Sequence, residues 1–375
     1  MKVPILLPNI FDYPFTYESD IKLKIGDFVE VPFGRTKTTG VVWDRFEKNN
    51  SKKFKIKKVI NKLDIPSLKK NTLDFLNWFS EYNIVPKGMA LKLLLTSWKD
   101  SKNIDEKFYD NLVFNGEDNL IRLTADQKKS LEQINNSNKK FNVHVLQGAT
   151  GSGKTFVYFE ALRKVLAKGF QGLILLPEIG LTNQFEKKFI EFFKFKPAVW
   201  HSGITKKNKE IIWNGIIRGK ISVVLGARSS LFLPFKNLGL IIVDEEHDQS
   251  YKQDEGIIYN ARDMAVSRAS FEKIPINLIT SVPSVETYEN IKKKKYKVSK
   301  LERRYQNASM PNYEIINMNQ VTLQKQTWIS KEIIQKVNLH LKKKDQVLFF
   351  LNRRGFSPSV FCKKCLNIFS CPNCS

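Results

Sequence analysis

The sequence has no long apolar run, and this absence excludes one class of protein at the outset. No stretch approaches the roughly 18 consecutive apolar residues that a membrane-spanning helix needs. The first residues, MKVPILLPNIFDYPF, also lack the layout of a secretory signal peptide with a small-residue cleavage site. We therefore expect a cytoplasmic protein that does not contact a membrane.

Cysteine is scarce and unevenly distributed. The four cysteines all lie in the last fourteen positions, as Cys362, Cys365, Cys371 and Cys374. A disulfide framework would be spread over a secreted domain, so this clustering indicates metal instead. Two intervening residues in each pair let both thiolates meet one tetrahedral Zn²⁺. Only five residues separate the pairs, which is short for a single four-cysteine site, so further ligands are expected elsewhere.

Acidic residues are few, and basic residues exceed them by a wide margin. The chain has 62 Lys and Arg against 37 Asp and Glu, a formal net charge of +25. Such a charge steers a protein toward polyanions, and phosphate contacts release condensed counterions, so nucleic acid is the natural partner. The alternative is a compositional bias, since Lys outnumbers Arg and Asn and Ile abound. The short lysine tract at 292–295 is typical of solvated surface.

The chain of 375 residues is long enough for two or three domains, and its hydrophobic content of 42% is sufficient for their buried cores. In residues 1–97, short apolar runs alternate with turn residues such as Gly26, Gly34 and Gly40, which predicts a small β-rich domain. Apolar residues at helical spacing around a Pro-Lys-Gly turn predict two helices that complete it. Residues 98–120 are polar and charged and are interpreted as a linker.

An α/β architecture with a parallel sheet is predicted for residues 121–300. Short β-branched runs, FNVHVLQ, LILLP, ISVVLGA, LGLIIVDEE and INLITS, alternate with longer amphipathic stretches. This pattern predicts a RecA-like motor lobe. A further strand, QVLFFLN, is expected near Gln346, so residues 301–375 are interpreted as the start of a second lobe together with the cysteine segment.

A phosphate-binding loop follows the first strand of this region. Residues 148–155, GATGSGKT, carry Gly148, Gly151, Gly153, Lys154 and Thr155 between a predicted strand and a predicted helix. The glycines allow backbone N–H groups to wrap the phosphates of ATP at the helix N-terminus. Lys154 can reach the β and γ phosphates, and Thr155 can hold Mg²⁺.

Two further segments point to the same nucleotide. Asp244 and Glu245 follow the strand LGLIIV, and ligands of such sheets lie outside the carboxyl ends of the strands. Asp244 suits Mg²⁺ and Glu245 suits the polarisation of water, so Lys154, Asp244 and Glu245 form the predicted catalytic set. An acidic cluster alone would more often be a solvated turn; the phosphate loop upstream favours the catalytic reading. Gln127 could read adenine through its side-chain amide.

Several longer strings carry a resemblance to a known family. GATGSGKTFVYFE, LLPEIGLTNQ, HSGITKKNKEIIW, LGARSSLFLPF, DEEHDQSYKQDEGIIYNARDMAVSRA and FFLNRRGFSPSVFCKKC together look like a superfamily 2 helicase. More specifically they resemble the PriA family of replication-restart helicases, also called primosomal protein N′. The resemblance spans nearly the whole chain.

The resemblance implies two DNA-contacting regions. Residues 248–262 correspond to the aromatic-rich loop of the family, which couples single-stranded DNA contact to ATP hydrolysis; Tyr251, Tyr259 and Arg262 are then DNA contacts, with the two rings suited to stacking on bases. The N-terminal strings PILLPNIFDYPFTY and DFVEVPFGRTKTTGVVW resemble the domain that captures the 3′ end of a nascent strand. The DNA-binding residues implied there are Phe15, Thr16, Gly34 and Lys57.

Three departures from the family pattern limit what can be carried over. The family has Asp where Thr16 stands, and it has a winged-helix domain where only 98–120 remain, so that domain is expected to be reduced or absent. The family also continues with a second lobe, its arginine finger and four more cysteines, which hold two Zn²⁺ ions by interleaved pairing. The chain is therefore expected to be C-terminally truncated, with half of each zinc site and negligible turnover alone.

The leading hypothesis is an ATP-dependent 3′ to 5′ DNA helicase that recognises stalled forks and restarts replication by primosome assembly. In it Arg228 assists the nucleotide site. Expected partners are forked and single-stranded DNA, primosome and helicase-loading proteins and single-stranded DNA-binding protein, with the chain monomeric and nucleoid-associated. One alternative is a shortened adaptor that binds ATP and fork DNA without turnover. Another is a different superfamily 2 translocase, such as an RNA helicase or restriction-system motor.

Overall fold

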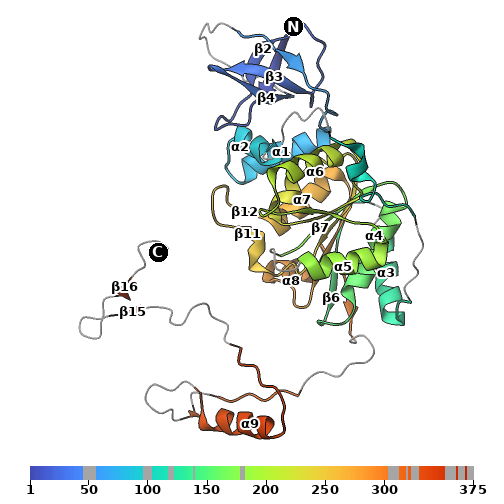
Figure 1. Cartoon of the computed structure of the whole chain (residues 1–375), viewed down its shortest axis with the longest axis vertical. Helices are drawn as coiled ribbons and strands as arrows, with labels where there is room; N and C mark the ends of the chain where they lie inside the picture. The colour runs from blue at the N-terminus through green and yellow to red at the C-terminus, as the bar shows by residue number, and fades with distance from the viewer. Residues whose placement is uncertain are drawn as a thin grey trace. The chain divides into compact units, whose positions relative to one another are not determined.

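The structure is a computed structural model, which describes most of the chain in two compact units (Figure 1). The first unit is Met1–Ser309 and the second is Met310–Ser375. The described residues are 1–44, 56–95, 104–116, 122–137, 140–177, 182–302, 312–317, 320–321, 329–350, 360–361 and 368–369. None of the helices in these ranges combines the length and apolarity that a membrane crossing requires.

The chain begins with a five-stranded antiparallel sheet, which confirms the predicted β-rich N-terminal region. Its strands, in the spatial order β2-β1-β4-β3-β5, are β1 (Lys2–Leu6), β2 (Phe15–Glu18), β3 (Phe28–Phe33), β4 (Thr36–Val42) and β5 (Asn61–Lys62). Gly34 has a φ of 60° in the tight turn between β3 and β4, a conformation that favours glycine. Gly40 is also required, because a Cβ there would lie 2.4 Å from Ile5 Cγ2.

The two predicted helices follow as α1 (Lys70–Tyr82) and α2 (Lys87–Leu95). Both helices pack against the α/β lobe of the same compact unit. Phe79 lies edge-on to Phe232 and Tyr259, with ring centroids 4.9 and 5.6 Å away. The Trp213 indole N–H donates to Leu94 O at 2.8 Å. The N-terminal helices therefore share a hydrophobic core with the α/β lobe.

The α/β lobe is built on a seven-stranded sheet in the order β14-β6-β13-β10-β7-β9-β8, and every neighbouring pair is parallel. This confirms the predicted parallel sheet. Its strands are β6 (Asn142–Gly148), β7 (Gln171–Leu175), β8 (Ala198–Trp200), β9 (Val223–Gly226), β10 (Leu238–Val243), β13 (Pro275–Thr280) and β14 (Lys297–Leu301). The short edge strands β8 and β14 carry weak patterns and were not among the predicted strands.

Helices cover both faces of this sheet (Figure 1). They are α3 (Ala125–Ser137), α4 (Lys154–Leu166), α5 (Thr182–Phe193), α6 (Lys206–Arg218), α7 (Ala261–Glu272) and α8 (Val285–Lys292). Alternation along the strands divides the core, so that Leu173 and Leu175 face one side and Ile174 the other. The side of Ile174 is covered by α4 and α5, whereas α6, α7 and the N-terminal helices cover the opposite side.

The segment predicted as a polar linker is packed on the lobe where it is described. The 3-10 helix η1 (Glu106–Tyr109) buries Tyr109, whose hydroxyl donates to Ile211 O at 2.8 Å. Leu112 is buried, and its carbonyl accepts from Ser222 N at 3.0 Å. The linker interpretation is therefore wrong for residues 104–116. A few well-placed apolar side chains suffice to pack this segment onto the lobe, because the lobe supplies the rest of the hydrophobic core.

The second unit contains α9 (Lys331–Lys342) and a pair of short antiparallel strands, β15 (Val360–Phe361) and β16 (Ile368–Phe369). The strand predicted near Gln346 is absent from residues 346–350, so that prediction is wrong for the described part. Leu348 and Phe350 are 89% and 79% exposed. A strand needs a hydrogen-bonded neighbour, and residues 345–350 have no strand pairing.

The packing of β6 against β14 predicts a pH-dependent stability. His144 is 2% exposed, and its Nε2 lies 2.6 Å from Ser299 Oγ, which itself donates to Gln133 Oε1. Burial lowers the pKa of His144 from 6.5 to about 4. The folded state therefore binds the proton less well than the unfolded state, so the stabilisation is complete above pH 6.5 and falls as the pH decreases toward 4.

We expect the free energy of unfolding to decrease by about 2 kcal/mol between about pH 7 and pH 5 through this group. Replacement of His144 by Gln should reduce that decrease while lowering stability at neutral pH. Urea unfolding at both pH values measures the effect. Equal pH dependence in the two proteins would assign the effect to other groups.

Candidate nucleotide and DNA sites

The phosphate-binding loop has the predicted setting, because β6 ends at Gly148 and α4 begins at Lys154. Gly151 and Gly153 both have φ of 82°, in the left-handed region that side chains disfavour. A Cβ on Gly153 would lie 2.3 Å from Gln127 Nε2. The loop backbone thus depends on glycine both for its dihedral angles and for the close approach of Gln127.

Lys154 is held across this loop. Its side chain is 7% exposed, and Nζ donates to Gly148 O at 2.7 Å and to Ala149 O at 3.4 Å. The first N–H groups of an α-helix lack an acceptor one turn earlier in the chain, and such a terminus attracts phosphate. Ser152 Oγ is buried without a hydrogen-bond partner among the described residues. An ammonium, a helix N-terminus and the unpaired Ser152 hydroxyl fit a nucleotide phosphate.

Asp244 follows the last residue of β10, across β13 from the phosphate loop. Its Oδ2 accepts from the Tyr158 hydroxyl at 2.9 Å, and its Oδ1 accepts from Glu245 N at 3.0 Å. Burial raises the pKa of Asp244 from 3.8 to about 6, the nearby carboxylate of Glu245 adds to the rise, and Lys154 opposes it. A carboxylate in this position fits the oxygen ligand that Mg²⁺ prefers.

Glu245 differs from its neighbours because it combines a strained backbone with an accessible side chain. Its φ is 44°, which is uncommon for a residue other than glycine. The carboxylate is 38% exposed and lies 3.7 Å from His247 Nδ1. His247 Nδ1 also lies 2.8 Å from Thr280 Oγ1, at the end of β13. The exposed carboxylate is therefore available to water.

Glu246 is the centre of a buried network that the sequence did not reveal. It is 1% exposed, and its carboxylate accepts from Ser284 N and Oγ at 2.8 and 3.0 Å. It also accepts from Thr287 Oγ1 at 2.9 Å and from Arg262 Nη1 at 3.4 Å. One side chain next to the acidic pair thereby fixes the start of α8 and the start of α7.

Gln127 lies at the phosphate loop, as predicted, and both atoms of its amide have protein partners. Oε1 accepts from Thr124 N at 3.0 Å, and Nε2 donates to Ser152 O at 3.1 Å. Its position links α3 to the loop. Recognition of adenine by this amide stays a prediction.

The aromatic residues of the loop at 248–262 lie inward. Tyr251 and Tyr259 are 1% and 3% exposed, and Arg262 is 6% exposed. The Tyr251 hydroxyl lies 2.6 Å from Asp244 O, and the Tyr259 ring packs on Phe79. Base stacking and phosphate contact both need exposed groups, whereas these three side chains are buried here, so their contact with DNA stays a prediction. Conversely, Arg228 Nη1 donates to Lys252 O at 2.7 Å, which connects it to this loop.

Three of the four residues predicted for capture of a DNA 3′ end come together on the N-terminal sheet, namely Phe15, Gly34 and Lys57. Phe15 packs against Phe33 with ring centroids 5.4 Å apart, beside Gly34 at the hairpin turn. Lys57 Nζ donates to Gly34 O at 3.1 Å. Thr16 is exposed on β2. This proximity is consistent with a single site. Binding of a DNA 3′ end at this site stays a prediction.

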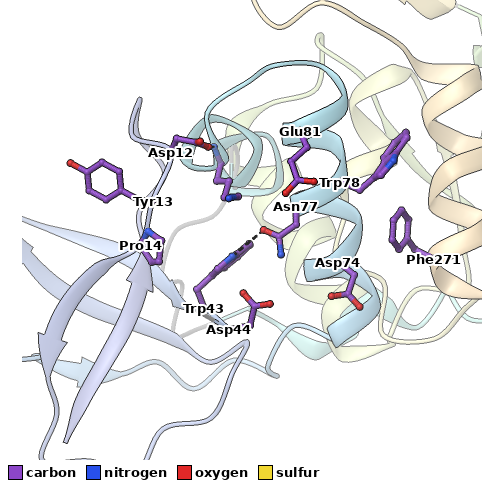
Figure 2. Close-up of a pocket in the computed structure, with 11 residues that line it drawn as sticks. Asp12, Tyr13, Pro14, Trp43, Asp44, Asp74, Asn77, Trp78, Glu81 and Phe271 are labelled. Atoms are coloured by element: carbon purple, nitrogen blue, oxygen red, sulfur yellow. Dashed lines mark hydrogen bonds between the residues drawn. The ribbon is translucent and has the colours of Figure 1, made fainter. Parts of the chain in front are cut away.

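A separate cavity of about 610 Å³ lies where the N-terminal sheet meets α1 and α7 (Figure 2). Its lining residues are Asp12, Tyr13, Pro14, Trp43, Asp44, Asp74, Asn77, Trp78, Glu81, Lys87 and Phe271. Trp43 Nε1 donates to Asn77 Oδ1 at 3.1 Å across it. Its carboxylates outnumber its one lysine and would repel a phosphodiester. None of the predicted 3′-end residues lines this cavity, so the cavity and the predicted 3′-end site are separate.

The four cysteines at 362, 365, 371 and 374 lie outside the described residues, so zinc binding stays a prediction. Among the residues that are described, no group of three or more His, Cys, Asp and Glu side chains is arranged to hold a metal.

Two buried side chains at the nucleotide site, those of Glu246 and Tyr158, were not predicted from the sequence. Tyr158 stands one helical turn after Lys154, on the same face of α4, which is the signal that could have revealed it.

The fold and the site define the nucleotide-binding lobe of a P-loop helicase. Residues 124–291 match the family described as DEAD/DEAH box helicase, and residues 2–96 match the family described as 3′ DNA-binding domain (3′BD). Sequence similarity narrows the class. Replication restart protein PriA of Rickettsia conorii is 43% identical over 99% of this chain, and that of Haemophilus influenzae is 31% identical over 98%.

The chain belongs to the PriA family of replication restart proteins. It spans 56% of the length of the Rickettsia protein and 60% of the Haemophilus protein. Similarity to solved structures is lower. The Hef helicase domain of Pyrococcus furiosus has a TM-score of 0.37 and 15% identity, covering 48% of this chain and 39% of that one.

The Glu246 network generates a prediction about stability. Replacement of Glu246 by Ala should leave the Arg262 guanidinium and the Ser284 and Thr287 hydroxyls without their shared acceptor, at a cost of about 3–5 kcal/mol. Glu286, which is 69% exposed and lies 3.6 Å from Arg262, provides the matched control. Its replacement by Ala should cost less than about 1 kcal/mol. Urea unfolding measures both, and similar losses would contradict the central role of Glu246.

Proposed function

We propose that the chain binds ATP with Mg²⁺ and DNA as part of a replication-restart helicase. The observation that carries this proposal is the convergence of three neighbouring strands at one sheet edge. There β6 leads into the phosphate loop, β10 into Asp244 and Glu245, and β13 into Thr280. The match of residues 2–96 to a DNA-binding family supports the assignment of DNA rather than RNA as the polymer.

The proposed chemistry distributes four tasks among residues at this edge. Lys154 and the N-terminus of α4 hold the β and γ phosphates, and Thr155 and Asp244 hold the metal. Bound Mg²⁺ would neutralise charge that develops on the phosphates. Glu245, the more exposed carboxylate, orients and polarises the attacking water. Arg228 assists through its connection to the loop that contains Lys252.

The activity proposed for the whole protein extends beyond this site. It comprises 3′ to 5′ unwinding at stalled forks, capture of a nascent 3′ end by the N-terminal region, and primosome assembly. The protein partners would be helicase loaders and single-stranded DNA-binding protein. The names of the relatives support the replication-restart role. The cysteines would contribute to zinc binding, as the family resemblance implies.

Replacement of Lys154 by Ala should abolish binding of a fluorescent ATP analogue, because the ammonium that holds the phosphates is lost. Lys164→Ala, an exposed change on the same helix, should leave it intact. Fork-DNA binding should survive both changes. Absence of Lys154-dependent nucleotide binding in the wild-type chain would contradict the proposal.

DNA-stimulated ATP hydrolysis by the same proteins separates the remaining possibilities. Turnover that depends on Lys154 would make this chain an active motor, against our expectation of negligible turnover. Nucleotide and fork binding without turnover would favour an adaptor role for the chain by itself.

The 3′-end site yields a separate prediction. A carboxylate at position 16 would accept a charge-assisted hydrogen bond from a 3′-hydroxyl, which the Thr16 hydroxyl can do only more weakly. Thr16→Asp should therefore increase the preference for a 3′-hydroxyl over a 3′-deoxy end by roughly tenfold. Thr205→Asp, which adds the same charge at the exposed start of α6, is the control. Equal preference in both variants would remove Thr16 from the site.

A further inference from the structure

Tyr158 occupies a position that the established features of a phosphate-binding loop do not explain. It lies on α4, is fully buried, and donates its hydroxyl hydrogen to Asp244 Oδ2 at 2.9 Å. The hydroxyl therefore links α4, which begins directly after the glycines of the phosphate loop, to the carboxylate proposed to hold Mg²⁺.

A second tyrosine holds the backbone of the same aspartate. Tyr251 is 1% exposed, and its hydroxyl lies 2.6 Å from Asp244 O and 3.0 Å from Leu175 O. A phenol has one hydrogen to donate, so the shorter contact marks Asp244 O as the acceptor. Asp244 is thus held at its carboxylate from α4 and at its carbonyl from the loop after β10.

We propose that Tyr158, together with Tyr251, is a positioning residue that sets the Asp244 carboxylate for Mg²⁺–nucleotide binding. This inference rests on the proposed nucleotide function and deepens it. Mg²⁺ requires near-octahedral geometry, so a carboxylate free to rotate binds it less well. With Oδ2 bonded to Tyr158 and Oδ1 to Glu245 N, the carboxylate plane has one orientation.

The hydroxyl, rather than the ring, carries this role. A phenylalanine at either position would keep the ring packing and remove only the donor. A ring that served packing alone would have no need of a buried hydroxyl, because a buried polar group is costly unless it is hydrogen-bonded. Tyr109 offers a matched comparison, since its buried hydroxyl also donates to a carbonyl, that of Ile211, on a helix separate from the nucleotide site.

The test is a Mg²⁺ titration of fluorescent ATP-analogue binding by the full chain and its Tyr158→Phe, Tyr251→Phe and Tyr109→Phe variants. We expect the half-saturating Mg²⁺ concentration to rise roughly tenfold in Tyr158→Phe and by a smaller factor in Tyr251→Phe. Tyr109→Phe should match the wild type. Binding in the presence of a chelator should be equal in all four proteins, because the phosphate loop is unchanged.

Thermal unfolding of the same samples identifies a merely structural effect. If Tyr158→Phe lowers the melting temperature but leaves the Mg²⁺ titration within about twofold of the wild type, the positioning role is wrong. If nucleotide binding weakens equally with Mg²⁺ and with chelator, the hydroxyl supports the loop rather than the metal ligand, and the inference is again wrong. Wild-type protein that fails to bind nucleotide at all overturns the proposed function itself.

Discussion

The structure depends on one constraint: parallel strands deliver their carboxyl ends to the same edge of a sheet, where polar groups are partly buried and must be satisfied. At that edge lie an ammonium, from Lys154, and two carboxylates, from Asp244 and Glu246. Each has protein partners, respectively the loop carbonyls, the Tyr158 hydroxyl and the cluster around Arg262. A buried charge without partners would be strongly destabilising. Satisfying these groups therefore also orders the loops and helices that surround the nucleotide site.

The N-terminal helices are part of the same arrangement. They contribute to the hydrophobic core on one face of the parallel sheet, where Phe79 contacts both Phe232 and Tyr259. Tyr259 belongs to the segment that also contains Tyr251, and Tyr251 reaches Asp244. The DNA-binding and nucleotide-binding regions are consequently joined by packed side chains. This continuity offers a physical connection between the two regions, carried by aromatic contacts.

The segment at 248–262 illustrates how tertiary packing decides the surroundings of an aromatic side chain. The family resemblance implies DNA contact for its two tyrosines and Arg262, and in the structure both rings are buried and Arg262 is enclosed by acidic partners. An aromatic residue in a polar stretch can be a base-stacking platform or a core residue with a hydrogen-bonding tip. The choice depends on what lies above the ring, and here that is Phe79, almost two hundred positions away along the chain.

The sequence alone determined the parallel α/β lobe, the β-rich N-terminal region and the residues at the phosphate loop. These features have local causes, namely strand periodicity, glycine dihedral angles and the order of motifs, which neighbouring residues encode. Only the tertiary structure decided the partners of Glu246, the contact of Tyr158 with Asp244 and the packing of residues 104–116. Each of these joins groups that are distant in the chain, and no local pattern specifies which buried donor meets which buried acceptor.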